Sequence, residues 1–184
     1  NKHAIYLIGD VTDLDNLCDD DFDYIIHLAA FARLQTSFLE PRKYLENNIN
    51  ATLSVCEYAR EKKSKLIFSS SSTIMHGEKK NPYTFSKKLC EDIIQTMSNL
   101  FDLKYVICRF YNVYGNREPF DKRDSTVVQK FIAQYNNSEP LTIVGDGTQS
   151  RDFTNVADIA EGINSIIKND SIENEIIHLG TSKN

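Results

Sequence analysis

Short apolar runs alternate with longer amphipathic stretches along the chain. The runs are Ala4–Ile8, Tyr24–Leu28, Lys65–Ser69, Tyr105–Phe110, Leu141–Val144 and Ile176–Leu179. Most of them are continuous rather than alternating, which is typical of strands that are buried on both faces of a sheet. We therefore expect each run to form a strand of a parallel sheet.

The amphipathic stretches between these runs predict helices. They cover Tyr44–Lys62, Tyr83–Phe101, Ser125–Tyr135 and Val156–Ile167. Within Tyr83–Phe101, apolar residues recur about every 3.6 residues, as on one face of a helix. Strands that alternate with helices at this spacing predict βαβ units, and so an α/β fold with a doubly wound parallel sheet. Ligands of such sheets bind beyond the carboxyl ends of the strands, so chemistry is sought in the residues after each strand.

Composition and charge narrow the class of protein. With 184 residues, of which 41% are hydrophobic and 26% charged, the chain can form a globular domain with a sizeable core. The formal net charge is -5 and no run is rich in Lys and Arg, which argues against nucleic acid or an anionic membrane surface as a partner. The apolar runs are far too short to span a bilayer.

The cysteines and histidines do not form a metal-binding pattern. Cys18, Cys56, Cys90 and Cys108 contain no CxxC pair, and no cluster of histidines accompanies them. This spacing argues against a zinc site and against a disulfide framework. We expect reduced thiols, no metal and a cytoplasmic protein.

The pentapeptide Tyr83-Thr84-Phe85-Ser86-Lys87 carries the first candidate chemistry. Residues four apart lie on one face of a helix, so Tyr83 and Lys87 can share a site. A nearby ammonium stabilises a phenolate and lowers the pKa of the phenol, which makes Tyr83 a candidate general base near neutral pH. The same spacing also arises by chance, and alone this stretch equally fits the start of a half-exposed helix.

Hydroxyl side chains follow the apolar run that begins at Lys65. The sequence Ser69-Ser70-Ser71-Ser72-Thr73 stands at the carboxyl end of this expected strand, just ahead of the helix that carries Tyr83. A serine in this place can donate to a substrate oxygen and relay a proton. Without the following helix, a serine-rich loop is the simpler interpretation.

Two further strand ends carry candidate ligand contacts. Asp10 follows the first apolar run, and His27-Leu28-Ala29-Ala30 ends the second. Small side chains such as Ala29 and Ala30 let a flat ligand lie close to the backbone. His27 is interpreted as a hydrogen-bonded structural residue rather than a catalyst.

Taken in order, these motifs resemble those of the extended short-chain dehydrogenase/reductases, in particular the NAD-dependent epimerase/dehydratase group. On the cofactor side, Gly9-Asp10-Val11-Thr12-Asp13 matches the family's GDxxD, His27-Leu28-Ala29-Ala30 matches its HxAA, and Glu46–Leu53 matches a helix whose Asn48 braces the active site. The resemblance implies that Asp10 and Val11 hold the adenine of NAD. The other residues that it places at the cofactor are Leu28, Ala29, Ala30, Asn48, Ser69, Tyr83 and Lys87.

On the catalytic and substrate side, the resemblance implies that Ser71, Tyr83 and Lys87 are the catalytic residues. Arg109–Gly115 matches RxxNxxG, whose Asn112 contacts the nucleotide diphosphate; Pro140–Asp158 matches the nucleotide-sugar segment, whose Arg151 pairs with phosphate. An arginine suits that role because its planar fork binds phosphate oxygens in pairs. The resemblance further leads us to expect Arg33 at the sugar.

The sequence departs from the family's pattern in two informative places. Its glycines, at positions 9, 77, 115, 145, 147, 162 and 180, do not make the GxxGxxG loop that cradles the cofactor pyrophosphate. We therefore expect the first βαβ unit to be missing, which leaves NAD and NADP undistinguished. The usual Val-Tyr-Gly after the serines reads Ile74-Met75-His76-Gly77, so Ser72 and Thr73 remain alternates to Ser71.

The resemblance implies a Rossmann-like NAD-binding domain over residues 1–115 and part of a smaller substrate-binding region over residues 116–184, interleaved with the last strands. The implied reaction is C4 epimerisation of a nucleoside-diphosphate hexose through a 4-keto intermediate, by a homodimer, with this chain inactive by itself. A nucleotide-sugar 4,6-dehydratase or decarboxylase is one alternative, and a non-catalytic nucleotide-binding protein of the same fold is another. Elimination needs carboxyl groups beside the catalytic hydroxyl, and none lies between Ser69 and Gly77.

Overall fold

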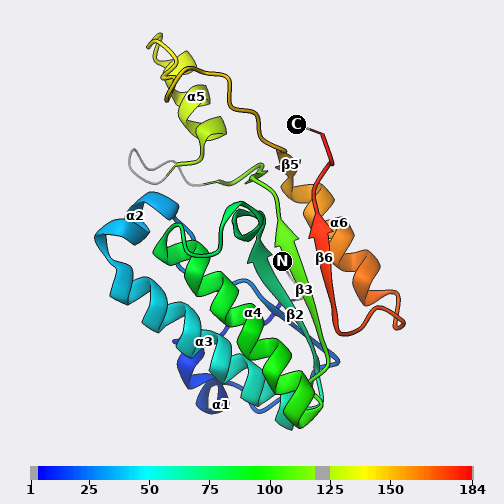
Figure 1. The fold of residues 1–184 in the computed structure, drawn as a ribbon. Coiled ribbons are helices and arrows are strands. Elements are labelled where there is room, and N and C mark those ends of the chain that lie inside the picture. Colours follow the sequence, from blue (N-terminus) through cyan, green and yellow to red (C-terminus); the bar gives the residue numbers. More distant parts are fainter. Residues whose placement is uncertain (1–3, 119–124, 184) are drawn as a thin grey trace.

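The centre of the molecule is a parallel sheet of four strands in the order β1-β2-β3-β6 (Figure 1). The strands are β1 (Tyr24–His27), β2 (Lys65–Ser71), β3 (Tyr105–Phe110) and β6 (Glu175–Leu179). The computed structural model describes residues 4–118 and 125–183. In the register of the sheet Ser70 lies beside Arg109, and Arg109 lies beside His178. The carboxyl ends of β2, β3 and β6 therefore meet at one edge of the sheet.

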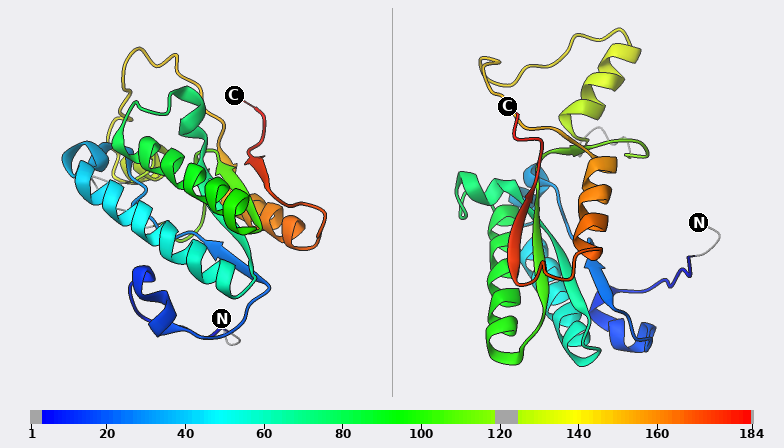
Figure 2. Two further views of the ribbon diagram at one scale, coloured as in Figure 1. Left: turned by 60° about the horizontal axis from the view of Figure 1, so that its bottom comes forward. Right: turned by 90° about the vertical axis from the view of Figure 1, so that its right-hand side faces the viewer.

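Helices cover both faces of this sheet, as the right-hand view of Figure 2 shows. On one face, α3 (Pro41–Glu61) and α4 (Pro82–Phe101) bury a core with the alternate strand residues Leu66, Phe68 and Ile107. On the other face, α6 (Val156–Ile167) packs against strand residues whose side chains point to the opposite side of the sheet, such as Ile67 and Val106. The centres of β2 and β3 are continuous apolar runs because successive residues there meet a helix on one side of the sheet or the other.

Helix α4 begins and ends where its sequence provides caps. Asn81 accepts a hydrogen bond from the backbone N–H of Thr84 at 2.8 Å, and Pro82 occupies the first turn, where its missing N–H costs nothing. At the other end Asp102 takes a left-handed conformation with φ 58°. The start of α4 is thereby fixed beside the end of β2.

The remaining elements are short or lie outside the sheet. They are η1 (Val11–Asp13), α1 (Leu14–Leu17), α2 (Leu34–Leu39), η2 (Ser72–His76), β4 (Val113–Tyr114), α5 (Val127–Asn136) and β5 (Thr154–Asn155). Strands β4 and β5 pair with each other in a second, parallel sheet. Helix α5 stands away from the main sheet in Figure 1 and contains no buried residue.

Four of the six expected strands are confirmed to within two residues at each end, and so are the α/β class and the parallel sheet. The expectation of strands at Ala4–Ile8 and Leu141–Val144 is wrong, since neither range is a strand in the structure. Their apolar side chains are exposed instead, with Ile8 at 98% and Val144 at 78%. An apolar run becomes a strand only where a neighbouring strand takes up its hydrogen bonds, and the described part of the chain places no strand beside either range.

Candidate active site

Three consecutive serines at the end of β2 each contact a different residue on one face of α4. The Nζ of Lys87 donates to the carbonyl of Ser69 at 2.7 Å, and the hydroxyl of Ser70 donates to Glu91 at 2.5 Å. The side chain of Ser71 lies close enough to Tyr83 to lower the pKa of its phenol. Tyr83, Lys87 and Glu91 follow one another at intervals of four, so they share the face of α4 that lies against the sheet. The structure thus brings together Ser71, Tyr83 and Lys87, as expected from the sequence.

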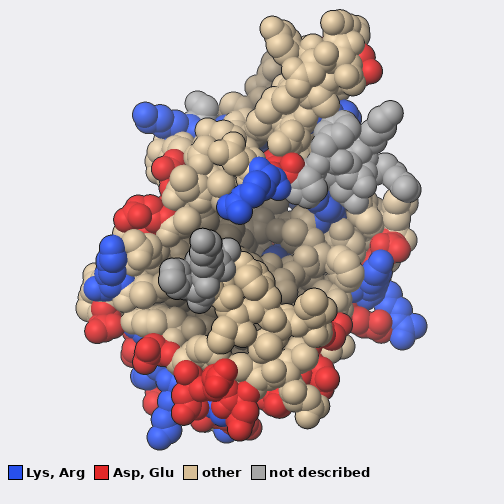
Figure 3. Space-filling view, turned by 180° about the vertical axis from the view of Figure 1, so that it is seen from behind, with Lys and Arg blue, Asp and Glu red and all other residues tan. Residues whose placement is uncertain are grey.

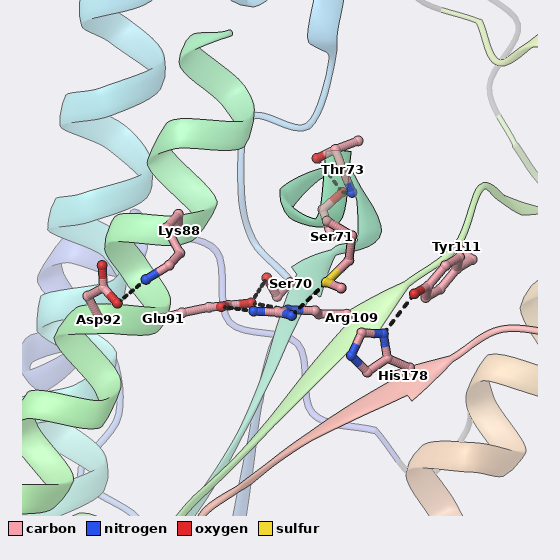
Figure 4. A network of polar contacts seen from close by, with 10 residues as sticks. Ser70, Ser71, Thr73, Lys88, Glu91, Asp92, Arg109, Tyr111 and His178 are labelled. Atoms are coloured by element: carbon pink, nitrogen blue, oxygen red, sulfur yellow. Dashed lines mark hydrogen bonds and ion pairs between the residues drawn. The ribbon is translucent and has the colours of Figure 1, made fainter. Parts of the chain in front are cut away.

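Ser71 is held at the edge of the strand by its own local hydrogen bonds. Its Oγ lies 2.9 Å from the Oγ1 of Thr73 and accepts the backbone N–H of Thr73 at 3.3 Å (Figure 4). The Thr73 hydroxyl in turn accepts from the hydroxyl of Thr84 at 2.9 Å. Of the alternates to Ser71, Thr73 is thus occupied in a chain of hydroxyls, whereas Ser71 meets both that chain and Tyr83.

The surroundings of Tyr83 differ from the sequence expectation. Burial raises the pKa of Tyr83 above its ordinary value, while the hydrogen bond with Ser71 and the positive charge of Arg33 oppose this rise. The Lys87 ammonium donates to the carbonyl of Ser69, so its influence on the pKa of Tyr83 stays a prediction. The positive charge of Arg33 favours the phenolate of Tyr83, an influence that the sequence did not indicate.

Lys87 is a buried cation, with 3% of its surface exposed. Burial lowers its pKa to about 8, and the charges of Cys90 and Glu91 oppose this shift. Its Nζ lies over the Phe68 ring, 4.7 Å from the ring centroid. The face of an aromatic ring attracts a cation. A lysine in this setting changes its charge near physiological pH.

His27 has the structural role that the sequence suggested. It is buried at the end of β1, its Nε2 lies 3.3 Å from the hydroxyl of Thr52, and its ring packs against Phe68 at 5.6 Å between centroids. Burial and, secondarily, the charge of Lys87 lower the pKa of His27 to about 4. His27 is therefore neutral at physiological pH.

Asn48 joins the loop after β1 to both long helices. Its Oδ1 accepts the backbone N–H of Phe31 at 2.8 Å, and its Nδ2 donates to the Phe31 carbonyl at 3.1 Å and to the Ser86 hydroxyl at 2.9 Å. The Ser86 hydroxyl donates to the carbonyl of Tyr83 at 2.7 Å. This buried amide thus reaches the backbone of Tyr83 through one hydroxyl.

The candidate cofactor residues do not all line one cavity. Asp10 accepts from the N–H and hydroxyl of Thr12 at 2.9 and 2.7 Å, hydrogen bonds that lower its pKa. It lines a cavity of about 700 Å³ together with Thr12, Phe31, Asn47 and Asn50, among others. Val11 lies beside it in η1, whereas Leu28, Ala29 and Ala30 follow β1 outside this lining.

These residues fit a dinucleotide in part. Small side chains at the end of β1 leave room for a flat ring, and Asp10 can accept from an adenine or ribose. The glycines of the chain, however, do not form the phosphate loop that such a cofactor needs. Asp10 and the small side chains after β1 therefore suit the adenine and nicotinamide ends of the cofactor better than its pyrophosphate.

The candidate substrate residues lie on three separate segments. Arg33 lines a smaller cavity of about 250 Å³ between the end of β4 and the starts of α5 and α6. Asn112 has φ 31° and donates from Nδ2 to the carbonyl of Asp152 at 2.8 Å. Arg151 is exposed, and its guanidinium donates to the carbonyl of Ser150 at 2.6 Å. Figure 3 shows the molecule from behind, where the surface is hollowed below α5 and a Lys or Arg side chain stands at the rim.

Two further residues shape this region and were not singled out from the sequence. Asp152 is buried and accepts from the backbone and hydroxyl of Thr181 and from the N–H of Ser182, which ties the segment with Arg151 to the end of β6. Gly115 has no room for a side chain, because a Cβ there would lie 2.3 Å from Cγ1 of Val156. The RxxNxxG spacing could have indicated Gly115, but nothing in the sequence pairs Asp152 with Thr181.

None of the helices in residues 4–118 and 125–183 is long and apolar enough to cross a membrane. Within the same ranges no three His, Cys, Asp or Glu side chains gather as ligands for a metal ion.

Comparison with known proteins shows the family. The profile of the NAD dependent epimerase/dehydratase family matches residues 2–180, so the chain belongs to that family. A UDP-glucuronate 4-epimerase from Thermodesulfobacterium geofontis is 34% identical over 173 residues, which cover 87% of this chain and 52% of the relative. A more distant relative, 28% identical, is a dTDP-D-glucose 4,6-dehydratase from Dictyostelium discoideum.

Solved structures that resemble this fold include two 4-epimerases. A UDP-N-acetylglucosamine 4-epimerase from Methanobrevibacter ruminantium, in complex with UDP-N-acetylmuramic acid, has a TM-score of 0.81 at 33% identity over 95% of this chain and 59% of its own. A UDP-glucuronic acid 4-epimerase from Bacillus cereus, in complex with UDP-glucuronic acid and NAD, has a TM-score of 0.80 at 30% identity over 95% of this chain and 58% of its own. The chain thus spans less than two thirds of the length of each of these proteins.

Proposed function

We propose that the full-length protein, meaning the polypeptide that carries this chain with any residues before or after it, is a NAD-dependent nucleotide-sugar 4-epimerase. The observation that carries the proposal is the meeting of Ser71, Tyr83 and Lys87 at the end of β2. A proton acceptor, a hydroxyl and a buried cation lie there on a strand end and one helix face. The match to the NAD-dependent family supports the choice of cofactor.

In this proposal the residues of the chain handle protons and placement. Tyr83 accepts the proton of the sugar 4-hydroxyl, and Ser71 hydrogen-bonds to the same oxygen as the 4-keto sugar forms. Arg33 and Ser71 favour the phenolate of Tyr83, since a positive charge and a donated hydrogen bond both stabilise it. NAD, when bound, would supply the hydride-transfer chemistry at C4 of the sugar.

Binding is assigned to residues on both sides of this centre. Asp10 and Val11 would hold the adenine, while Leu28, Ala29, Ala30, Asn48, Ser69 and Lys87 would line the rest of the cofactor. Arg33, Asn112 and Arg151 would bind the sugar and the diphosphate, so residues 116–184 would contribute mainly to the substrate. A homodimer in the cytoplasm is also part of the proposal, and sedimentation of the full-length protein would test the dimer.

The alternatives differ in the acid groups that they require. A 4,6-dehydratase must take a proton from C5 and protonate the leaving C6 hydroxyl, and carboxylic acids suit both steps. The first acid after Ser71 is Glu78, which is exposed beyond η2. The carboxylate nearest to the serines is Glu91, which is already bound by Arg109 and Ser70. A non-catalytic protein of the same fold has no use for a buried lysine beside a serine and a tyrosine.

Product analysis of the full-length protein tests the proposal. Incubated with UDP-glucose, UDP-glucuronic acid or UDP-N-acetylglucosamine and followed by NMR, it should convert at least one of them to its C4 epimer. No 4-keto-6-deoxy sugar and no carbon dioxide should appear. Accumulation of a 4-keto-6-deoxy sugar would make it a dehydratase, and binding of a nucleotide sugar without any turnover would favour the non-catalytic alternative.

A further inference from the structure

Glu91 is a buried carboxylate that accepts three hydrogen bonds. Only 1% of its surface is exposed. The guanidinium of Arg109 donates to it twice, from Nε to Oε1 at 2.9 Å and from Nη2 to Oε2 at 2.6 Å (Figure 4). The hydroxyl of Ser70 adds a third hydrogen bond to Oε1 at 2.5 Å. One helix and two strands are thus joined at a single carboxylate.

Stability alone does not account for such a pair. Removing two charges from water is costly, and well-packed apolar residues of similar size often stabilise a fold as much as a buried ion pair or more. The two parallel hydrogen bonds from the guanidinium of Arg109 also fix the orientation of the Glu91 carboxylate relative to the strand. The pair therefore calls for an explanation in terms of geometry.

The geometry connects this pair with the residues on either side of Ser71. Ser70 and Arg109 are neighbours in the register of β2 and β3. The Nη1 of Arg109 also contacts the sulfur of Met75, in the η2 turn that follows Ser71, at 3.1 Å. Ser70 before Ser71 is thus bonded to this ion pair, and Met75 after it, which is 57% exposed, contacts the same Arg109.

The pair also fixes α4 along its axis. Glu91 lies one turn beyond Lys87 and two turns beyond Tyr83 on the same helix face. A shift of α4 against β2 would break the bonds of Glu91 to Ser70 and Arg109. The carboxylate is therefore one of the ties between the strand end and the helix, beside the bond of Lys87 to Ser69.

We propose that Glu91 and Arg109 are positioning residues, which hold Ser71 opposite Tyr83 and Lys87 through Ser70 and Met75. This inference rests on the proposed function, since it assigns a role in the same reaction. Neither residue needs to touch substrate or cofactor. Their effect is expected on the chemical step and much less on binding.

The main experiment replaces the pair by apolar residues in the full-length protein. Glu91→Leu with Arg109→Met leaves no charge unpaired and should keep the thermal midpoint and circular dichroism close to those of the parent. We expect kcat to fall about 10-fold to 100-fold with KM changed less than about 2-fold, because displacement of a reacting group by about 1 Å can cost on the order of 10²-fold. Arg109→Lys, which keeps the charge but loses the fork, should retain more activity than the double variant.

The matched control is a second ion pair on the same helix. Lys88 and Asp92 pair on α4 one residue further along, and do so without contacting β2 (Figure 4). Lys88→Gln with Asp92→Asn should leave kcat at the level of the parent. A folded Glu91→Leu, Arg109→Met protein with the kcat of the parent would overturn the proposal, as would an equal loss in the control.

A milder variant covers the case in which the double variant does not fold. Ser70→Ala removes only the hydroxyl that links β2 to Glu91, and it should lower kcat severalfold with KM unchanged; an unchanged kcat overturns the proposal. If the parent itself turns over no nucleotide sugar, the proposed function fails and hydrogen exchange decides the inference. Faster exchange of the Thr73 amide in Ser70→Ala than in the parent supports the positioning role, and equal exchange contradicts it.

Discussion

Asn48 donates a hydrogen bond of 2.9 Å to the hydroxyl of Ser86 and so joins α3 to α4 on the buried side of the active site. The same amide satisfies both the N–H and the carbonyl of Phe31. We expect Asn48→Ala to lower the free energy of unfolding by about 2 kcal/mol, because buried polar groups lose their partners. Urea denaturation measures this loss. Asn50→Ala, at an exposed position of the same helix, is the control, and an equal loss in both variants would contradict the bracing role of Asn48.

Tyr83→Phe should reduce turnover of the full-length protein by roughly 10²-fold or more, the scale of one general acid–base group. Substrate affinity should change little, because a ring of the same shape remains against Ser71. Steady-state kinetics with the epimerised sugar, together with calorimetry for binding, would measure both effects. Turnover equal to that of the parent would show that the proton acceptor lies elsewhere.

Lys87→Met should lower turnover and move the pH optimum upward. Burial places the pKa of Lys87 at about 8, below the ordinary value of a lysine, so the ammonium loses its proton as pH rises through 8. If catalysis needs the cation, the turnover of the parent falls above that pH, and the variant lacks this fall. The pH dependence of kcat for parent and variant tests the assignment, and profiles of the same shape would leave Lys87 a packing role.

His27 should make the fold sensitive to acid. Its pKa is about 4 in the folded protein and 6.5 in an unfolded chain, so between these values the unfolded chain binds a proton that the folded one does not. Stability is therefore lost as pH falls from 6.5 to 4, by about 3 kcal/mol in total. In His27→Gln the decline over this range should be smaller by about that amount. Urea titrations from pH 7 to 4 would show it, with His76→Gln, at an exposed position, as control.

Much of the fold could be predicted because a parallel strand that is buried on both faces appears in the sequence as a continuous apolar run. The run Tyr105–Phe110 is apolar until its end, and it meets helices on both faces. The run Ala4–Ile8 has the same composition, but whether it forms a strand depends on a neighbour, and the run itself carries no information about that neighbour. The same holds for Leu141–Val144, which lies on the segment beyond α5.

The site could be predicted where a local rule applies. The spacing of Tyr83 and Lys87 places them on one helix face, and extending that spacing by four residues would also have indicated Glu91. The direction of the Lys87 ammonium could not be predicted, because its choice between Tyr83 and the carbonyl of Ser69 depends on how deeply α4 packs on β2. The influence of Arg33 on Tyr83 likewise could not be predicted, because Arg33 lies in a loop and the sequence pattern does not indicate the path of a loop.

The exposed apolar segment at Ile5–Ile8 has a consequence for how the chain behaves in solution. Ile5 and Ile8 are 89% and 98% exposed, and β1, whose Ile26 is 42% exposed, has a strand partner on one side only within the described residues. Open strand edges and apolar patches of this kind promote association between molecules. The apparent molar mass of the 184-residue chain from light scattering should therefore rise with concentration despite its net charge of -5. Shelf life and solubility of the purified chain will depend on this flank more than on the stability of its core.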